Sequence, residues 1–258
     1  MRRADGSAGD ADYGTIGRGY TYYRRPDPAI ASAIVAALGD AATVVNVGAG
    51  AGSYEPHDRA VTAVEPSASM RAQRPASLPV ALDATAEQLP FASGSFDAAM
   101  TTFSVHQWGD LAAGLAELRR VATGPVVVLT CDPDTLDRFW LADYAPEVIA
   151  TEARRYPRPA LIAELVGGQT TVTTVPIPLD CSDGFGEAYY GRPELLLDPG
   201  ARLANSAWSF VGPEVEERFE RRLRDDLASG AWDARYGALR TTPEFLGSLV
   251  LIVARPST

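Results

Sequence analysis

VVNVGAGAGS, residues 44–53, is the stretch that decides the fold of this chain. Its first four residues are mostly β-branched, as in a strand that is buried on both faces. Glycine then occupies every second position, which suits a loop that a ligand approaches more closely than a Cβ would allow. Such a loop lies at the carboxyl edge of an open α/β sheet, where these folds bind ligands. Phosphates, dinucleotides and adenosyl sulfonium cofactors all use similar loops, so the residues after it must decide.

Strands and helices alternate along the chain on both sides of this loop. Strands are expected at 43–47, 60–64, 80–82, 96–101 and 126–130, and later at 171–178 and 249–254. Helices are expected at 29–38 and 111–122, and Ser67 can cap a short helix that contains Met70. The alternation predicts an α/β fold: a Rossmann-like, seven-stranded, mostly parallel sheet with helices on both faces.

The remaining segments predict the domain organisation. Residues 1–12 are small and polar and are expected to be a disordered tail, followed by an N-terminal helical flap at 13–42. Residues 43–180 and 245–258 are assigned to the cofactor-binding domain, and 181–244 to a helical lid inserted over a substrate pocket. Four aromatic residues of the insertion either line that pocket or form the core of the lid: Tyr189, Tyr190, Trp208 and Phe210.

Composition excludes several classes of partner. The 258 residues carry a formal net charge of −10, which argues against nucleic acid and against an anionic membrane surface. All 23 basic residues are Arg, so neither a lysine Schiff base nor a P-loop lysine is available. Cys131 and Cys181 have no metal-ligand spacing, and no apolar run reaches membrane-spanning length. We therefore expect a cytoplasmic protein with no metal site and no membrane partner.

Acidic residues follow the second and third expected strands. Glu65 stands where a carboxylate can accept hydrogen bonds from both hydroxyls of a ribose, because it has two acceptor oxygens. Asp83 can accept from an exocyclic adenine amine, while Ala84 leaves room for a flat ring and Met70 packs on it. The convergence of these groups on one sheet edge predicts an adenosine-containing ligand.

Three segments carry a family resemblance: VVNVGAGAGSYE at 44–55, AVEPSASM at 63–70 and DATAEQLPFASGSFDAAMTTFSVHQW at 83–108. Together they resemble the class I S-adenosylmethionine-dependent methyltransferases of the small-molecule, type 11-like kind. The resemblance covers residues 43–130. It implies S-adenosylmethionine as cofactor and methyl transfer to an O, N or C atom of a small organic molecule. The Ala- and Arg-rich composition adds an association with bacterial specialised metabolism.

The resemblance also implies which residues hold the cofactor. Gly48, Ala49, Gly50 and Gly52 would line its methionine and ribose portion, Glu65 and Pro66 the ribose, and Met70, Asp83, Ala84 and Thr85 the adenine. Thr101 and Phe103 would lie beside the sulfonium end. The family usually has Asp where this chain has Asn46, which keeps an acceptor but loses a charge that favours the cationic amino group.

Three further residues are hypotheses. Arg24 is expected to neutralise the carboxylate of the cofactor, or else, with Arg25, only flanks a helix. His106 follows the fourth expected strand and suits a general base for the methyl acceptor, with a structural hydrogen-bonding role as the alternative. Trp108 either packs over the cofactor or fills the core.

Two other functional classes stay open. One is a protein of the same fold that binds an adenosyl cofactor but has a non-methylating activity or none. The other is a nicotinamide-dependent dehydrogenase, which requires a longer glycine loop that continues directly into a helix. Tyr54-Glu55-Pro56 interrupts the loop and counts against this class.

Overall fold

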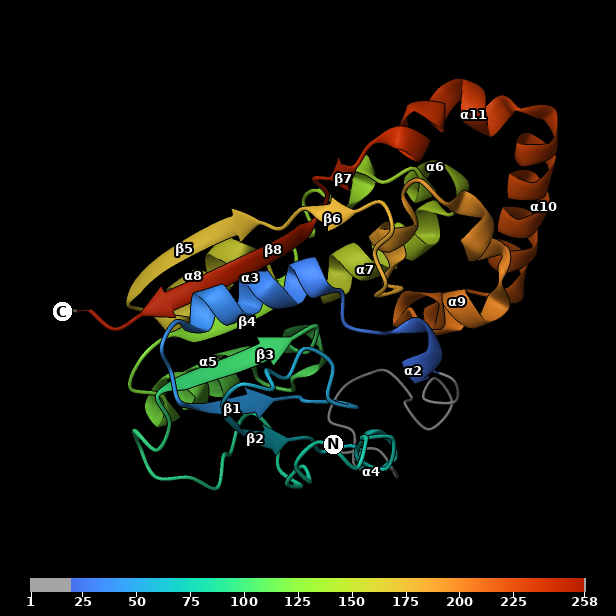
Figure 1. The fold of residues 1–258 in the computed structure, drawn as a ribbon. Helices are drawn as coiled ribbons and strands as arrows, with labels where there is room; N and C mark the ends of the chain where they lie inside the picture. The colour runs from blue at the N-terminus through green and yellow to red at the C-terminus, as the bar shows by residue number, and fades with distance from the viewer. Residues whose placement is uncertain (1–19, 258) are drawn as a thin grey trace.

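The computed structural model describes residues 20–257, and a six-stranded sheet lies at its centre (Figure 1). The strands are β1 (Thr43–Val47), β2 (Ala60–Val64), β3 (Ala98–Thr102), β4 (Val126–Cys131), β5 (Gln169–Thr174) and β8 (Leu249–Arg255). Their order is β2-β1-β3-β4-β8-β5; β1 to β4 pair in parallel, and β8 is antiparallel to both of its neighbours. The Rossmann-like, mostly parallel sheet is confirmed.

The expected strand at 80–82 is wrong, and the count is therefore six rather than seven. Only Leu82 pairs with the sheet, through a single bridge to Val64 of β2. Pro79 lacks a backbone N–H, and the side chain of Val80 is 90% exposed. A segment that buries so little apolar surface gains little stability from further strand pairing with β2.

Helices cover both faces of the sheet, as predicted. Helix α3 (Pro28–Leu38) is capped by Asp27, whose Oδ1 accepts from the N–H of Ala29 at 2.9 Å, and it packs on the face that carries Met100 and Val127. Helices α5 (Leu111–Val121) and α8 (Pro159–Val166) cover the opposite face, whose side chains belong to a separate buried cluster. Because successive side chains of a strand point to opposite faces of the sheet, each strand contributes residues to both buried layers.

A helical segment projects from the end of the sheet at which β6 and β7 pair (Figure 1). It lies between β6 (Ile177–Pro178) and β7 (Glu244–Phe245), which form an antiparallel ribbon. Its elements are η3 (Gly186–Tyr189), η4 (Pro193–Leu197), α9 (Pro199–Leu203), η5 (Ser206–Phe210), α10 (Pro213–Ser229), α11 (Ala231–Tyr236) and η6 (Gly237–Thr241). We call residues 179–243 the insertion.

A second group of helices, between β4 and β5, packs against the insertion. It consists of η2 (Leu136–Arg138), α6 (Leu141–Tyr144) and α7 (Pro146–Arg155). Trp140 at the start of α6 meets Trp232 of α11 edge to face, with ring centroids 5.8 Å apart. No helix is predicted from the sequence between β4 and β5, so the helical part of the molecule is larger than expected.

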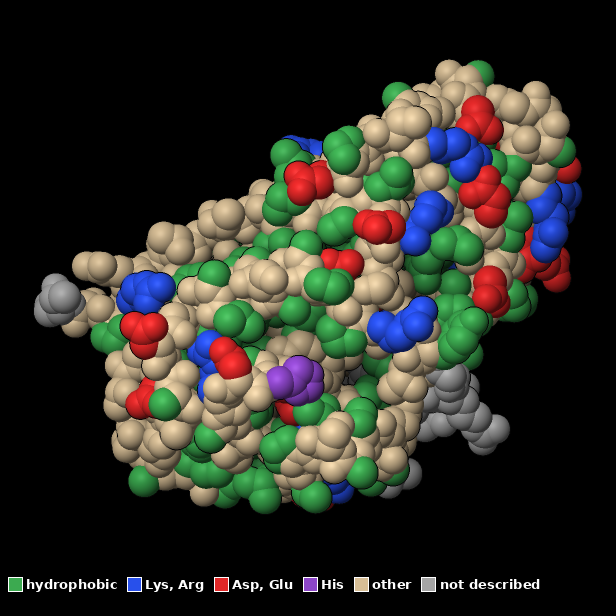
Figure 2. All heavy atoms as spheres, viewed as in Figure 1, with side chains coloured by type: hydrophobic (Ala, Val, Ile, Leu, Met, Phe, Trp, Pro, Cys, Tyr) green, Lys and Arg blue, Asp and Glu red, His purple; other side chains and the backbone are tan. Residues whose placement is uncertain are grey.

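Short elements complete the chain: α2 (Tyr20–Tyr23), α4 (Ala68–Arg71) and η1 (Val105–Gln107). The expected tail at 1–12 and the first part of the flap, 13–19, lie outside the described residues. On the face drawn in Figure 2, acidic and basic side chains are interspersed. No helix within residues 20–257 combines the length and apolarity needed to cross a membrane.

Candidate functional site

A cavity of about 840 Å³, including its open mouth, is lined by the glycine loop and by residues that follow β2 and β3. We call it the loop cavity. The strand order reverses between β1 and β3, and open α/β sheets bind their ligands at such a point. Eight of the residues expected to hold a cofactor line it: Arg24, Gly48, Ala49, Gly50, Glu65, Pro66, Met70 and Phe103. Trp108 lines it as well, which favours packing over a bound cofactor rather than a place in the core.

The glycine loop adopts a backbone that other residues rarely take. Gly48 and Gly50 have φ angles of 69° and 52°, in the left-handed region. The N–H groups of Gly48 and Ala49 both donate to the carbonyl of Val64, at 2.9 and 3.0 Å, which fixes the loop to the end of β2. A Cβ at position 48 would lie 1.8 Å from Oγ of Ser104. The loop therefore forms a cradle that only glycine permits.

Glu65, directly after β2, holds this cradle in place. Its Oε2 accepts from the N–H of Gly50 and its Oε1 from the N–H of Ser67, both at 2.8 Å. Burial raises the pKa of the Glu65 carboxyl. A carboxylate oxygen can accept more than one hydrogen bond, so the residue can orient the loop and still receive hydroxyl groups of a ligand.

Met70 reaches the loop cavity from the short helix α4. The Oγ of Ser67 caps this helix by accepting from the N–H of Met70 at 3.3 Å, as the sequence predicts. Met70 itself is buried and lies near Gly50: a Cβ at position 50 would meet its Cε at 3.4 Å. The thioether can therefore pack on a flat ring in the cavity.

Three of the residues expected beside an adenine ring lie away from the loop cavity. Asp83 pairs with Arg71 at 3.2 Å on the surface, and neither it nor Ala84 nor Thr85 lines the loop cavity. The physical reason is the missing strand: a segment that pairs at one residue does not carry Asp83 to the sheet edge. The lining in this part of the chain comes instead from the next two residues, Ala86 and Glu87.

Asn46 is fully buried within β1 and does not line the loop cavity. Its Nδ2 donates to Oε1 of Glu55 at 3.1 Å, while Oε2 of Glu55 accepts from Nη2 of Arg74 at 2.8 Å. The amide thus supplies a hydrogen-bond donor that an Asp carboxylate at this position would lack. The neighbour that explains this residue, Glu55, was not expected.

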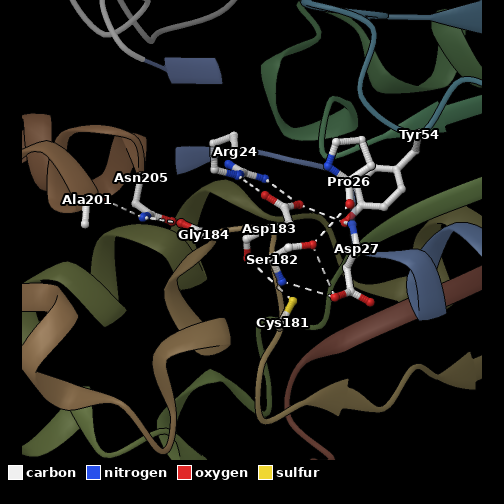
Figure 3. Close-up of polar contacts among 10 residues, drawn as sticks. All are labelled: Arg24, Pro26, Asp27, Tyr54, Cys181, Ser182, Asp183, Gly184, Ala201 and Asn205. Atoms are coloured by element: carbon white, nitrogen blue, oxygen red, sulfur yellow. Dashed lines mark hydrogen bonds and ion pairs between the residues drawn. The ribbon is translucent and has the colours of Figure 1, made fainter. Parts of the chain in front are cut away.

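Arg24 lines the loop cavity, yet its charge is already balanced (Figure 3). Its Nε lies 2.5 Å from Oδ1 of Asp183, and its Nη2 lies 3.4 Å from Oδ2. The hydroxyl of Tyr54 donates to the same Asp183 at 2.9 Å and accepts from the N–H of Asp27. The carboxylate that pairs with Arg24 is therefore that of Asp183, within the protein itself. Through it, the insertion contacts the N-terminal segment at Arg24 and the residue after the glycine loop, Tyr54.

Three other expected residues lie in different surroundings. Thr101 is fully buried in β3, and Gly52 faces Leu78, so neither lines the loop cavity. Phe103, by contrast, has a φ of 50°, which is rare for a bulky residue. Non-glycine residues in this region persist where the surrounding structure requires them, and Phe103 lies on the boundary between two cavities.

The second cavity measures about 560 Å³, including its open mouth, and shares Tyr20, Arg24 and Phe103 with the loop cavity. We call it the acidic cavity, because the carboxyl groups of Glu152 and Glu187 are in its wall. His106 lines this cavity rather than the loop cavity, and its ring lies 4.4 Å from that of Tyr156.

Sequence reasoning missed most of the acidic cavity. Its residues come from α7, from the insertion and from the loop before β8, and no short motif joins them. The four expected aromatic residues of the insertion do not line either cavity. Tyr190 and Trp208 are core residues instead, and Phe185 forms the wall. An Asp-Gly-Phe-Gly run at 183–186 was the available signal for a tight turn.

Fold and site together define a class of protein. A mostly parallel sheet with a glycine cradle, a carboxylate after β2 and a second cavity beside it fits a class I methyltransferase. Residues 45–129 match the family model described as a methyltransferase domain. The chain therefore carries a domain of the class I S-adenosylmethionine-dependent methyltransferase family, and S-adenosylmethionine is its cofactor.

Solved structures agree with this assignment. A proposed methyltransferase from an antibiotic biosynthesis pathway of Anabaena variabilis is 28% identical, with a TM-score of 0.83 over 90% of this chain and 98% of that one. A possible histamine N-methyltransferase of Thermotoga maritima, 18% identical, has a TM-score of 0.55 over 93% and 94%. A geranyl diphosphate methyltransferase in complex with GPP and sinefungin, also 18% identical, has a TM-score of 0.50 over 88% and 77%. The last two show the fold alone, and no curated protein matches the chain.

Proposed function

We propose that this protein transfers the methyl group of S-adenosylmethionine to an O, N or C atom of a small organic molecule. The observation that carries the proposal is the contact between the two cavities, which share Tyr20, Arg24 and Phe103. One cavity has the cradle for the cofactor, and the other, which adjoins it, would receive the acceptor. Two ligands held on either side of Phe103 would meet at that boundary, and such positioning is the main source of rate in a displacement at carbon.

The residues of the chain would divide the work as follows. Gly48 and Gly50 leave room for the cofactor, and Glu65 receives its ribose hydroxyls while it keeps the loop in place. The bound cofactor supplies an electrophilic methyl group. Phe103, whose ring packs against that of Phe185 with centroids 5.4 Å apart, would border both ligands where they meet and help to exclude water.

We also propose that His106 accepts the proton of the acceptor. It is half-buried in the wall of the acidic cavity. An imidazole titrates near neutral pH, so it can remove a proton from a nucleophile at little cost. The ring contact with Tyr156 fixes its orientation.

Two further observations support the metabolic role and the cellular compartment that we propose. The 28% identical relative is described as belonging to an antibiotic pathway, which supports a role in bacterial specialised metabolism. Cys131 and Cys181 are both free thiols, which is consistent with the reducing cytoplasm.

Two measurements test this function. Thermal shifts with S-adenosylmethionine, S-adenosylhomocysteine and NAD should show stabilisation by the first two only. Transfer of label from methyl-labelled S-adenosylmethionine into small molecules of a bacterial extract should require the protein, and should fall at least 10-fold with His106→Ala. Stabilisation by NAD alone would refute the cofactor assignment. Cofactor binding without any labelled product would support the binding protein that lacks methylating activity.

A further inference from the structure

The acidic cavity has an excess of negative charge. Glu152 comes from α7 and Glu187 from η3, and among the described residues Arg24 is the only Arg in the lining. Arg24 is already paired with Asp183, so it offsets the charge of Glu152 only in part. Within residues 20–257, the cavity therefore holds two acidic groups and no uncommitted guanidinium.

The two carboxyl groups are not equivalent. Both oxygens of Glu187 accept from the N–H of Ser248, at 3.0 and 2.9 Å, and one also accepts from its hydroxyl at 2.7 Å. Glu187 is thus part of the structure that closes the insertion onto the strand β8. The side-chain carboxyl of Glu152, by contrast, accepts no hydrogen bond from and forms no ion pair with any residue in the described part of the chain.

Burial makes the free carboxyl group costly. It raises the pKa of Glu152 to about 7, against the weaker opposing effects of Arg155 and Arg24. Arg155 is committed elsewhere, since it donates to Oγ of Ser206 at 2.9 Å and lies over the ring of Phe210. A partly buried anion without a polar partner is destabilising, and a bound cation would reduce that cost.

The rest of the wall suits an organic cation. Aromatic rings of Tyr20, Phe103, Tyr156 and Phe185 line the cavity, and such rings attract ammonium groups through their faces. Tyr156 stays a neutral phenol, because burial raises its pKa well above the usual value. An anionic or phosphorylated acceptor would find no free cation among these groups.

We propose that the methyl acceptor is an organic amine that binds as its ammonium ion against Glu152, so that the transfer is an N-methylation. The proposal rests on the function above and names its substrate class. The ammonium gives one proton to His106, and its nitrogen then forms a bond to the methyl carbon as the carbon–sulfur bond breaks. The electron pair of that bond stays on sulfur as S-adenosylhomocysteine, and the product is an N-methylammonium ion beside Glu152.

The test compares three probes of equal size: 2-phenylethylamine, 2-phenylethanol and phenylacetate. Calorimetric titrations at pH 8 use the full chain, both free and saturated with S-adenosylhomocysteine. A second pair, tryptamine and tryptophol, repeats the comparison with a larger ring. We expect each amine to bind at least 10-fold more tightly than its alcohol, and phenylacetate to bind more weakly than either.

Variants assign the selectivity to one carboxylate. Glu152→Gln should lower amine affinity at least 10-fold and leave alcohol affinity within 2-fold, because the amide keeps the size and loses the charge. Glu164→Gln is the matched control, since Glu164 is exposed on α8 and lies outside both cavities. Its affinities should equal those of the wild type.

The outcomes separate the two proposals. Alcohols that bind as tightly as amines, or an amine affinity unchanged by Glu152→Gln, would overturn the amine inference. A failure to bind S-adenosylhomocysteine would count against the proposed function, while the titrations of the free chain would still decide the inference.

Discussion

The guanidinium of Arg24 lies against the carboxylate of Asp183, 159 residues away in the sequence, with Nε 2.5 Å from Oδ1. Both side chains are almost fully buried, at 10% and 2% exposure. Asp183 also accepts from the hydroxyl of Tyr54 beside the glycine loop (Figure 3). One carboxylate of the insertion thus fixes the N-terminal segment and the cofactor loop at the boundary of the two cavities.

Breaking this pair should destabilise the fold more than losing a surface pair. Arg24→Ala or Asp183→Ala leaves a buried charge without its partner and should lower the free energy of unfolding by about 3–5 kcal/mol. The double variant should lose less than the sum of the single losses, as measured by urea denaturation. Arg158→Ala is the control, because its pair with Asp134 is exposed. An Arg24→Ala loss no larger than the control would show that the pair is not the anchor.

Gly48→Ala should disrupt the cradle. The added Cβ meets Ser104, and the left-handed backbone alone costs about 1–2 kcal/mol. We expect S-adenosylhomocysteine to bind at least 10-fold more weakly by calorimetry. Gly39→Ala shares the positive φ but points into open space, so it should lower stability and spare binding. Ser104→Gly in the Gly48→Ala background should recover part of the affinity; no recovery would mean that the clash is not the cause.

Asn46→Asp should not improve cofactor binding, although the family usually has Asp there. It would place a second carboxylate 3.1 Å from Oε1 of Glu55, with Arg74 as the only cation in contact with that glutamate among the described residues. We expect a loss of about 1–3 kcal/mol in the free energy of unfolding, because two neighbouring carboxylates repel each other. Glu55→Gln in the same background supplies a donor and should restore stability. Tighter cofactor binding by Asn46→Asp would contradict this account.

Glu152 should make the protein less stable as pH rises. An unfolded Glu titrates near 4.5, and in the folded protein the pKa of Glu152 is about 7. Between these values the folded state keeps a proton that the unfolded chain has lost, so the free energy of unfolding falls with increasing pH. The groups that act on this titration are Arg24, Arg155, Cys131, Tyr156, Glu187 and, in the same cavity, His106.

Glu152→Gln should remove this part of the pH dependence. Above pH 7 the variant should be more stable than the wild type by about 1–3 kcal/mol, measured by urea denaturation at pH 5, 6, 7 and 8. Comparison with Glu164→Gln cancels the contributions of the other carboxyl groups. A wild type that is as stable as the variant at pH 8 would show that Glu152 is not strained by burial.

Much of the sheet could be predicted because its strands are short, buried and β-branched. The expected strands at 43–47 and 60–64 match β1 and β2 residue for residue, and the cap at Ser67 is as predicted. The segment 80–82 misled because three apolar letters do not reveal that Val80 is exposed. The local sequence indicates which secondary structure a residue favours. Whether that residue is buried depends on neighbours that the whole fold brings to it.

Much of the lining of the loop cavity could be predicted from the sequence for a related reason. Its residues follow consecutive strands, and parallel strands bring their carboxyl ends to one edge. The acidic cavity has no such ordering: Glu152, Glu187 and Ser248 meet only because α7, the insertion and β8 pack together. The partner of Asn46 was hidden likewise, since Glu55 is reached through a loop without regular structure.

The ribbon of β6 and β7 gives the insertion a single point of entry and exit. Ile177 pairs with Phe245 and Pro178 with Glu244, so residues 179–243 begin and end side by side. A recombination event at this ribbon could exchange the whole segment without cutting a strand of the main sheet. Any replacement must still present a carboxylate to Arg24, as Asp183 does here. Residues 179–243 could therefore be exchanged as one module, provided that the new segment supplies a carboxylate to pair with Arg24.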